Sequence, residues 1–165
     1  MDPSQAKTSS DPCFSWGVLV SHLKAAYENL ESPSYLFSHA FFDKQKYPEV
    51  LRFLEAHYNV NEDTEPNTDV SYGYFIEGVN LSAVLRVSFV GQYFYLSSLL
   101  EGGGEEEPSV ESSSDSSKAL LMKYMRDAGF VFTSGNVLKE KVIFGGHPTS
   151  VYSLLYSYEQ EPSWL

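Results

Sequence analysis

The sequence predicts an α+β domain: an antiparallel sheet of two three-stranded meanders, with two to three helices packed on one side. Apolar residues recur at helical spacing in the first third of the chain and alternate at every second position from residue 70 onward. The chain has 165 residues, 42% of them apolar and 15% aromatic, which is enough for one core without metal or disulfide support. We expect a single domain over residues 13–165 with the element order ααβββαβββ.

The chain is expected to begin with a disordered tail and a helix. Residues 1–12 are polar and contain two prolines, so they predict the tail. Residues 14–31 carry apolar side chains at helical spacing and predict an amphipathic helix, with Asp11 or Ser15 as its cap. The helix should stop before Pro33, because proline removes a backbone donor and disfavours helical geometry in the residue before it.

Further helices are predicted elsewhere in the chain. Residues 35–42 are strongly apolar with an ambiguous period, and we expect a short helix capped by Ser34. Pro48 suits the first turn of another helix, whose apolar stripe runs to Tyr58. Residues 118–128 also show helical spacing, and the glycine that follows them suits a left-handed C-terminal cap.

Two sets of strands are expected. The first meander consists of residues 70–77, 83–90 and 93–97, with Gly91-Gln92 as a two-residue hairpin turn that places the glycine at positive φ. The second meander consists of three later strands, separated by turns rich in glycine and serine. We place these three strands at residues 130–132, 137–144 and 151–158.

The charge is concentrated in one third of the chain. The formal net charge is −11, and residues 60–115 hold eleven acids against one base, Arg86. Most of these acids fall in two predicted loops, at residues 62–69 and 101–117. The second loop also contains three consecutive glycines and many serines, so we expect it to be flexible.

The acidic segment favours a basic protein partner. It would repel phosphate backbones and anionic lipid headgroups, so we expect neither nucleic acid nor membrane binding. It would attract a basic domain and speed its association at low salt. The alternative interpretation is that these loops are merely solvated and keep the protein in solution. The candidate partner-binding acids are Asp63, Glu65, Asp69, Glu101, Glu105, Glu106 and Glu107.

Aromatic residues supply the other candidate contacts. The chain has 12 Tyr, 11 Phe and 2 Trp, and tyrosines are enriched at protein interfaces. Four tyrosines lie on adjacent predicted strands and could form a shared binding face. Cross-strand packing in the core is the alternative for the same four residues. These are Tyr72, Tyr74, Tyr93 and Tyr95.

No motif indicates an active site. The single cysteine, Cys13, has no base at a spacing that indicates a catalytic pair, although His22 would be near it in a helix. No histidines occur in a metal-ligand spacing, and neither glycine run has the context of a phosphate loop. We therefore expect no catalytic residues, no metal and no cofactor. Nothing in the sequence reads as a signal peptide or membrane span, so a cytoplasmic protein is expected.

In size, charge and architecture, the chain resembles bacterial immunity proteins that neutralise polymorphic or contact-dependent toxins. The resemblance rests on no motif and implies no particular residues. It implies a non-enzymatic inhibitor, monomeric or weakly dimeric, that binds a basic toxin domain such as a nuclease and occludes it. The alternatives are a secretion-type chaperone, which would be dimeric, and a small ligand-binding domain or enzyme with an aromatic-lined pocket.

Overall fold

The computed structural model describes residues 13–109 and 116–165, so the predicted N-terminal tail lies outside the described residues. Its main feature is a five-stranded sheet with the spatial order β1-β2-β3-β4-β5, and β6 pairs with β7 in a separate hairpin. The strands are β1 (Asn59–Glu62), β2 (Ser71–Gly78), β3 (Leu81–Ser88), β4 (Tyr93–Ser98), β5 (Val131–Phe132), β6 (Lys141–Phe144) and β7 (His147–Ser150).

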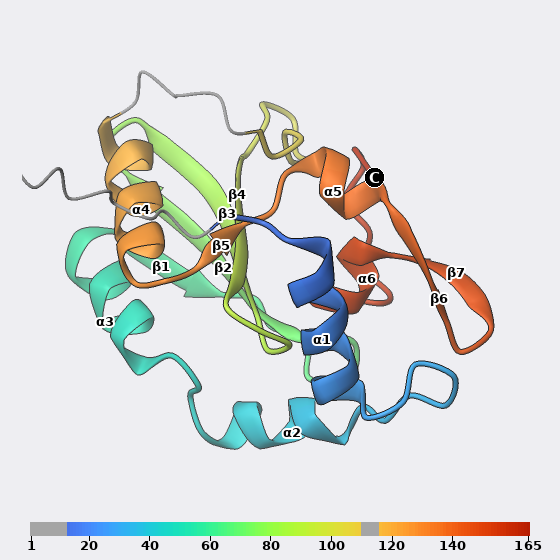
Figure 1. Cartoon of the computed structure of the whole chain (residues 1–165). Coiled ribbons are helices and arrows are strands. Elements are labelled where there is room, and N and C mark those ends of the chain that lie inside the picture. Colours follow the sequence, from blue (N-terminus) through green and yellow to red (C-terminus); the bar gives the residue numbers. More distant parts are fainter. Residues whose placement is uncertain (1–12, 110–115) are drawn as a thin grey trace, which may run out of the picture.

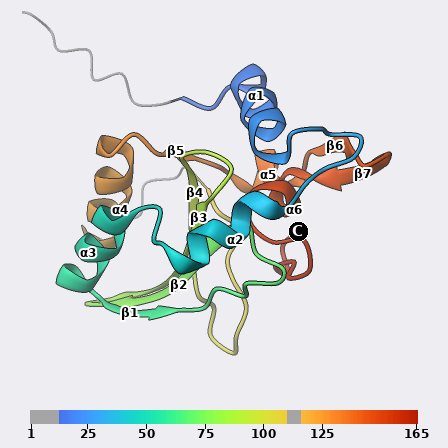
Figure 2. The same cartoon turned by 90° about the horizontal axis from the view of Figure 1, so that it is seen from below.

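Helices lie on both sides of the sheet. Two of them, α3 and α4, lie on one side in Figure 1, while α1, α5 and α6 lie on the other. In the view from below, α2 crosses between these two groups (Figure 2). The helices are α1 (Trp16–Tyr27), α2 (Leu36–Asp43), α3 (Pro48–His57), α4 (Ser116–Asp127), α5 (Gly135–Lys139) and α6 (Val151–Leu155).

The α+β class is confirmed, but the expectation of two to three helices on one side is wrong, because the described residues form six helices on both sides of the sheet. The first face of the sheet carries the apolar side chains of β2, β3 and β4 and packs against α3 and α4. On the second face, β4 presents Tyr93 and Tyr95, which join a separate cluster with α1 and α6. Because β4 is apolar on both faces, each face needs its own cover.

The first predicted meander is confirmed in outline. Strands β2, β3 and β4 are antiparallel neighbours, and Tyr74, Leu85 and Leu96 lie opposite one another across them. Strand β1 pairs antiparallel with β2 at the edge of the sheet, where the sequence predicted only the end of a helix and an acidic loop. With four residues and no clear alternation, β1 gives too short a pattern to identify.

The second predicted meander is wrong. Strand β5 pairs in parallel with β4, and the connection between them contains α4, as a parallel crossover requires. The predicted strand at 137–144 is divided between α5 and β6, and the first part of the predicted strand at 151–158 is α6. All five residues of α6 are buried. A short helix buried on every side has the same apolar run as a buried strand, so periodicity cannot separate the two.

The predicted helix ends agree more closely with the structure than the predicted second meander does. Ser15 caps α1 by accepting a hydrogen bond from the Val18 amide at 3.4 Å, and Pro48 is the first residue of α3. Gly129 has a φ of 90° after α4, as expected of a left-handed cap. The predicted cap at Ser34 is one residue off, because the N-cap position of α2 is Tyr35.

The turn between β3 and β4 differs from the expected one. Strand β3 ends at Ser88 and strand β4 begins at Tyr93, so four residues connect them instead of the predicted two. Gly91 has no positive φ. A Cβ there would lie 2.8 Å from the Tyr93 ring and 2.9 Å from His22 Nδ1, so space and not backbone conformation requires the glycine.

Within the described part of the chain, no helix is long and apolar enough to cross a membrane.

Candidate binding site

Arg86 stands at the centre of the site. It is the only base between residues 60 and 115, and it lies on β3, where alternation sends its neighbour Leu85 to the first face of the sheet and Arg86 to the second. Its side chain is only 7% exposed. A guanidinium that is buried to this extent needs anionic or hydrogen-bonding partners around it.

The first partner of Arg86 is Asp69. Arg86 Nη1 lies 3.4 Å from Asp69 Oδ2, and the Asp69 side chain is fully buried. The same oxygen accepts a hydrogen bond from the Glu65 amide at 2.8 Å. Asp69 is held against the segment that follows α6, because it bridges to Ser157 and because the next amide, of Val70, donates to the Tyr156 carbonyl at 2.9 Å. Asp69 thus belongs to the interior and not to the solvent-exposed part of the first acidic loop.

The ion pair leaves polar atoms without partners. In the part of the chain that the structure describes, Arg86 Nε and Asp69 Oδ1 are buried and have no hydrogen bond. Nη1 is the only nitrogen of the guanidinium that donates to another described residue. The pair is therefore charge-neutral but incompletely hydrogen-bonded, a state that costs free energy unless another group completes it.

Gly73 on β2 makes room for this arrangement. It lies opposite Arg86 in the sheet, and its carbonyl accepts a hydrogen bond from the Asp63 amide at 2.8 Å. A Cβ at residue 73 would lie 2.7 Å from the main-chain oxygen of Asp63 and 3.5 Å from Arg86 Nη1. The glycine therefore lets the first acidic loop lie close against the strand, beside the guanidinium.

The second acidic loop returns to the sheet at Glu105. The three glycines before it all have positive φ, and the Leu100 amide donates to the Gly104 carbonyl at 3.0 Å across the turn. Glu105 Oε2 then accepts hydrogen bonds from Tyr95 at 3.2 Å and Ser97 at 3.3 Å. The flexibility predicted for this loop stays a prediction, but its described residues make specific contacts with β4.

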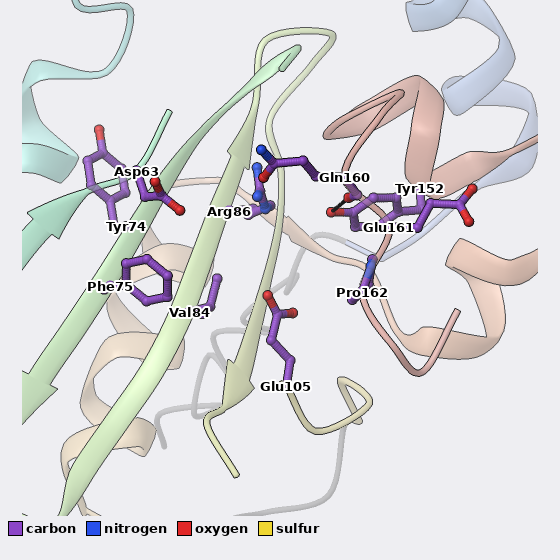
Figure 3. Close-up of a pocket in the computed structure, with 10 residues that line it drawn as sticks. All are labelled: Asp63, Tyr74, Phe75, Val84, Arg86, Glu105, Tyr152, Gln160, Glu161 and Pro162. Atoms are coloured by element: carbon purple, nitrogen blue, oxygen red, sulfur yellow. Dashed lines mark hydrogen bonds between the residues drawn. The ribbon is translucent and has the colours of Figure 1, made fainter. Parts of the chain in front are cut away.

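Arg86, Asp63 and Glu105 line one cavity of about 200 Å³ (Figure 3). Asp63 and Glu105 come from the two acidic loops, and in Figure 3 both carboxylates turn toward Arg86. The carboxylate of Glu161, from the C-terminal segment, points away from Arg86 in the same view. The complete lining is Asp63, Tyr74, Phe75, Val84, Arg86, Glu105, Tyr152, Gln160, Glu161 and Pro162.

A second cavity continues across the same face. It has a volume of about 320 Å³, and Phe75 lines both cavities. The Phe75 side chain is 38% exposed, unlike the other aromatic residues of β2. The half of the second face formed by β1, β2 and β3 therefore offers an aromatic ring between two hollows, and we call it the open half. The second cavity is lined by Asn59, Asn61, Phe75, Ile76, Glu77 and Leu99.

Burial and neighbouring groups shift the pKa values of two residues that line the first cavity, Arg86 and Tyr152. Burial by itself would lower the pKa of Arg86, but the pKa is raised above its ordinary value by the neighbouring groups Tyr152, Tyr95, Asp69 and Glu105. Tyrosines are uncharged at pH 7, so the two carboxylates stabilise the cation there. Burial also raises the pKa of Tyr152 to about 12, and the hydroxyl of Tyr152 donates to the Gln160 carbonyl at 2.9 Å.

The remaining predicted acids are scattered around the site. Glu65 is half-buried in the first loop, and Glu101 and Glu106 are exposed in the second. Glu107 pairs with Lys139 at 2.7 Å, with both side chains about 40% exposed. Of the seven predicted acids, Asp63 and Glu105 are the two that line the cavity.

The four predicted tyrosines are buried, so the core-packing alternative describes them. Tyr72 and Tyr74 belong to the first apolar cluster, and Tyr93 and Tyr95 belong to the second. Tyr74 reaches the wall of the cavity, and Tyr95 positions Glu105 from beneath it. Of the four, Tyr74 is the one that lines the cavity, and Tyr95 contributes through its hydrogen bond to Glu105.

Sequence reasoning missed several residues of the site. Arg86 carried one available signal, since it is a lone base within an acidic segment and within an apolar strand. Phe75 and Glu77 lie within the predicted strand at residues 70–77, but only the tertiary structure shows that they border a cavity. Tyr152 and Glu161 carried no signal, because only the tertiary structure brings the C-terminal segment to the sheet.

Another cavity, of about 270 Å³, contains both Cys13 and His22. The exposed cysteine thus lies in the same hollow as the histidine, whose Nδ1 is 2.8 Å from the Tyr93 hydroxyl. This contact occupies one ring nitrogen of His22 and orients the ring. Over residues 13–109 and 116–165, no three His, Cys, Asp or Glu side chains are grouped as metal ligands would be. The expectation that the protein needs no metal stays a prediction.

Comparisons of the chain with protein-family models, with curated proteins and with solved structures found no match.

Proposed function

We propose that this protein is a non-enzymatic inhibitor that binds a basic protein domain through the open half of the sheet. One observation supports the proposal above the others: Asp63 and Glu105, from two acidic loops about forty residues apart, line a single cavity. Glu161 adds a third acid there, and Glu77 lines the neighbouring cavity. A concave, acidic surface with an exposed aromatic ring fits the lysine- and arginine-rich surface of a basic partner.

The proposed mechanism is stoichiometric occlusion. Exposed acids steer a basic domain to the surface, and Phe75 and the two hollows supply the contact area once it arrives. A toxin domain that cleaves nucleic acid must carry a basic cleft, so covering that cleft would block its substrate. The proposal therefore keeps the function of a toxin-neutralising immunity protein and places its contact surface on the open half.

A peptide array with two charge-matched variants tests the binding surface. The test variant carries Asp63→Lys, Glu77→Lys and Glu161→Lys. The control variant carries Glu31→Lys, Asp43→Lys and Glu140→Lys, at exposed acids that line neither cavity. Both variants change the net charge by the same amount. We expect the wild type and the control to prefer basic peptides and the test variant to lose this preference. Equal losses in both variants would mean that net charge, and not this surface, attracts basic chains.

Inhibition is tested separately from binding. A panel of purified nuclease toxin domains is assayed for substrate cleavage with an equimolar amount of this protein. We expect cleavage by at least one basic domain to be blocked by the wild type and the control variant, and to persist with the test variant. If a domain is bound at the open half but cleaves its substrate at the normal rate, the inhibitor proposal fails and only the binding proposal survives.

A further inference from the structure

The cavity at Arg86 has a chemical character that a generally acidic surface does not. Its inner wall is formed by the Arg86 guanidinium, which has unused hydrogen-bond donors. The guanidinium makes one hydrogen bond with a described residue, through Nη1, and its Nε is buried without an acceptor. Asp69 already balances the charge of Arg86. What the inner wall lacks is therefore a hydrogen-bond acceptor, and a planar carboxylate is the group that best matches a guanidinium.

Two carboxylates with unused acceptor atoms line the same cavity as the guanidinium. Asp63 makes no side-chain hydrogen bond or ion pair with any described residue, and Glu105 uses only Oε2, leaving Oε1 without a donor. Both carboxylates turn toward Arg86 in Figure 3. Counting Asp69, three carboxylates surround one guanidinium, so a simple anion would be repelled. A ligand for this cavity needs a cationic group as well as a carboxylate.

We propose that the cavity binds a basic amino acid with its carboxylate on Arg86 and its cationic side chain at Asp63 and Glu105. The volume of about 200 Å³ suits a ligand of this size. The same two groups occur in free lysine or arginine and in a lysine or arginine at the C-terminus of a polypeptide. This site does not require the protein partner proposed above, and it concerns the interior of the cavity and not the wider face.

Small ligands test the carboxylate contact without altering the protein. Calorimetric titration at pH 7 and low salt compares L-lysine, Nα-acetyl-L-lysine, L-lysinamide and n-butylamine. We expect the two carboxylate-bearing lysines to bind with a Kd of about 1 mM or tighter, and the two compounds without a carboxylate to bind about tenfold more weakly. Equal binding of lysine and lysinamide would overturn the assignment of Arg86, and no detectable binding of any compound would overturn the site.

Two variants test the cationic end. Asp63→Asn with Glu105→Gln removes both carboxylates while leaving an oxygen on Glu105's replacement to accept from Tyr95 and Ser97. Glu161→Gln is the control, because that carboxylate lines the cavity but points away from Arg86. We expect lysine affinity to fall about tenfold in the double variant and to stay unchanged in the control. Lysine affinity that is equal in the double variant and the wild type would contradict the proposal.

The source of the ligand is distinguished by one further comparison. The acetylated tripeptide Ac-Ala-Ala-Lys with a free C-terminus carries the same carboxylate and ammonium as lysine, but with a chain attached. Binding of both the tripeptide and lysine indicates a polypeptide terminus, whereas binding of lysine alone indicates a free amino acid. If neither binds, the proposal fails even when the peptide array above succeeds, since that array tests the attraction of basic side chains and not the recognition of a carboxylate by Arg86.

Discussion

The two faces of the five-stranded sheet come from the same alternation along the strands, yet they serve different ends. The apolar packing of the first face is continuous, and Leu85 and Leu96 are buried there under α3 and α4. On the second face, apolar packing covers β4, where α1 and α6 lie over the strand. Over β2 and β3, the same face carries Arg86 and the exposed Phe75. One face therefore stabilises the fold, and the other face is divided between stability and a binding surface.

The largest effect should come from the ion pair on the divided face. Replacing Arg86 with Met leaves Asp69 buried without its cation, so we expect the free energy of unfolding to fall by about 3–5 kcal/mol. Adding Asp69→Asn to this variant removes the orphaned charge and should restore a large part of that loss. Urea unfolding of the single and double variants measures both effects. A single variant as stable as the double one would show that Asp69 is not held as a buried anion.

The next effect compares the two faces directly. Leu85→Ala opens a cavity under α3 and α4 and should lower the free energy of unfolding by about 2–5 kcal/mol. Phe75→Ala removes a larger side chain that is 38% exposed, and it should cost less than Leu85→Ala in the same urea titration. If the order is reversed, the open half carries more of the folding energy than its exposure indicates, and its assignment as a binding surface weakens.

A smaller effect should appear at alkaline pH on the divided face. The pKa of Tyr152 is about 12 in the folded state and about 10 in the unfolded chain. A raised folded pKa gives stability that is present below pH 10 and lost as the pH rises toward 12. Between pH 9 and pH 11, the wild type should therefore lose about 1 kcal/mol more than Tyr152→Phe, as measured by urea unfolding at both values. Parallel losses would place the Tyr152 hydroxyl in contact with solvent.

The smallest effect should come from the exposed ion pair of Glu107 and Lys139. Both side chains are about 40% exposed, so Glu107→Gln should change the free energy of unfolding by at most about 1 kcal/mol. Comparing this variant with the Arg86 variant separates burial from charge, since each removes one member of an ion pair. A loss as large as that at Arg86 would mean that Glu107 anchors the second acidic loop to α5 beyond its charge.

Much of the fold can be predicted where the local sequence has only one physical solution. Ser15, Pro48 and Gly129 mark helix ends through their own backbone chemistry, and the alternation in residues 70–97 defines three antiparallel strands. Prediction fails where two structures share one pattern. The buried run of α6 reads as a strand, and β5 is too short to reveal that it pairs in parallel with β4.

The sequence by itself determined the α+β class, the first meander and the concentration of acids in residues 60–115. Only the tertiary structure decided what those acids do. Docking of the α6 segment against the start of β2 buries Asp69, the glycine turn returns Glu105 to β4, and Gly73 admits the loop that carries Asp63. Charge is a property of composition, but the position of each charge depends on contacts between segments far apart in the chain. The cavity at Arg86 therefore exists only in the folded protein.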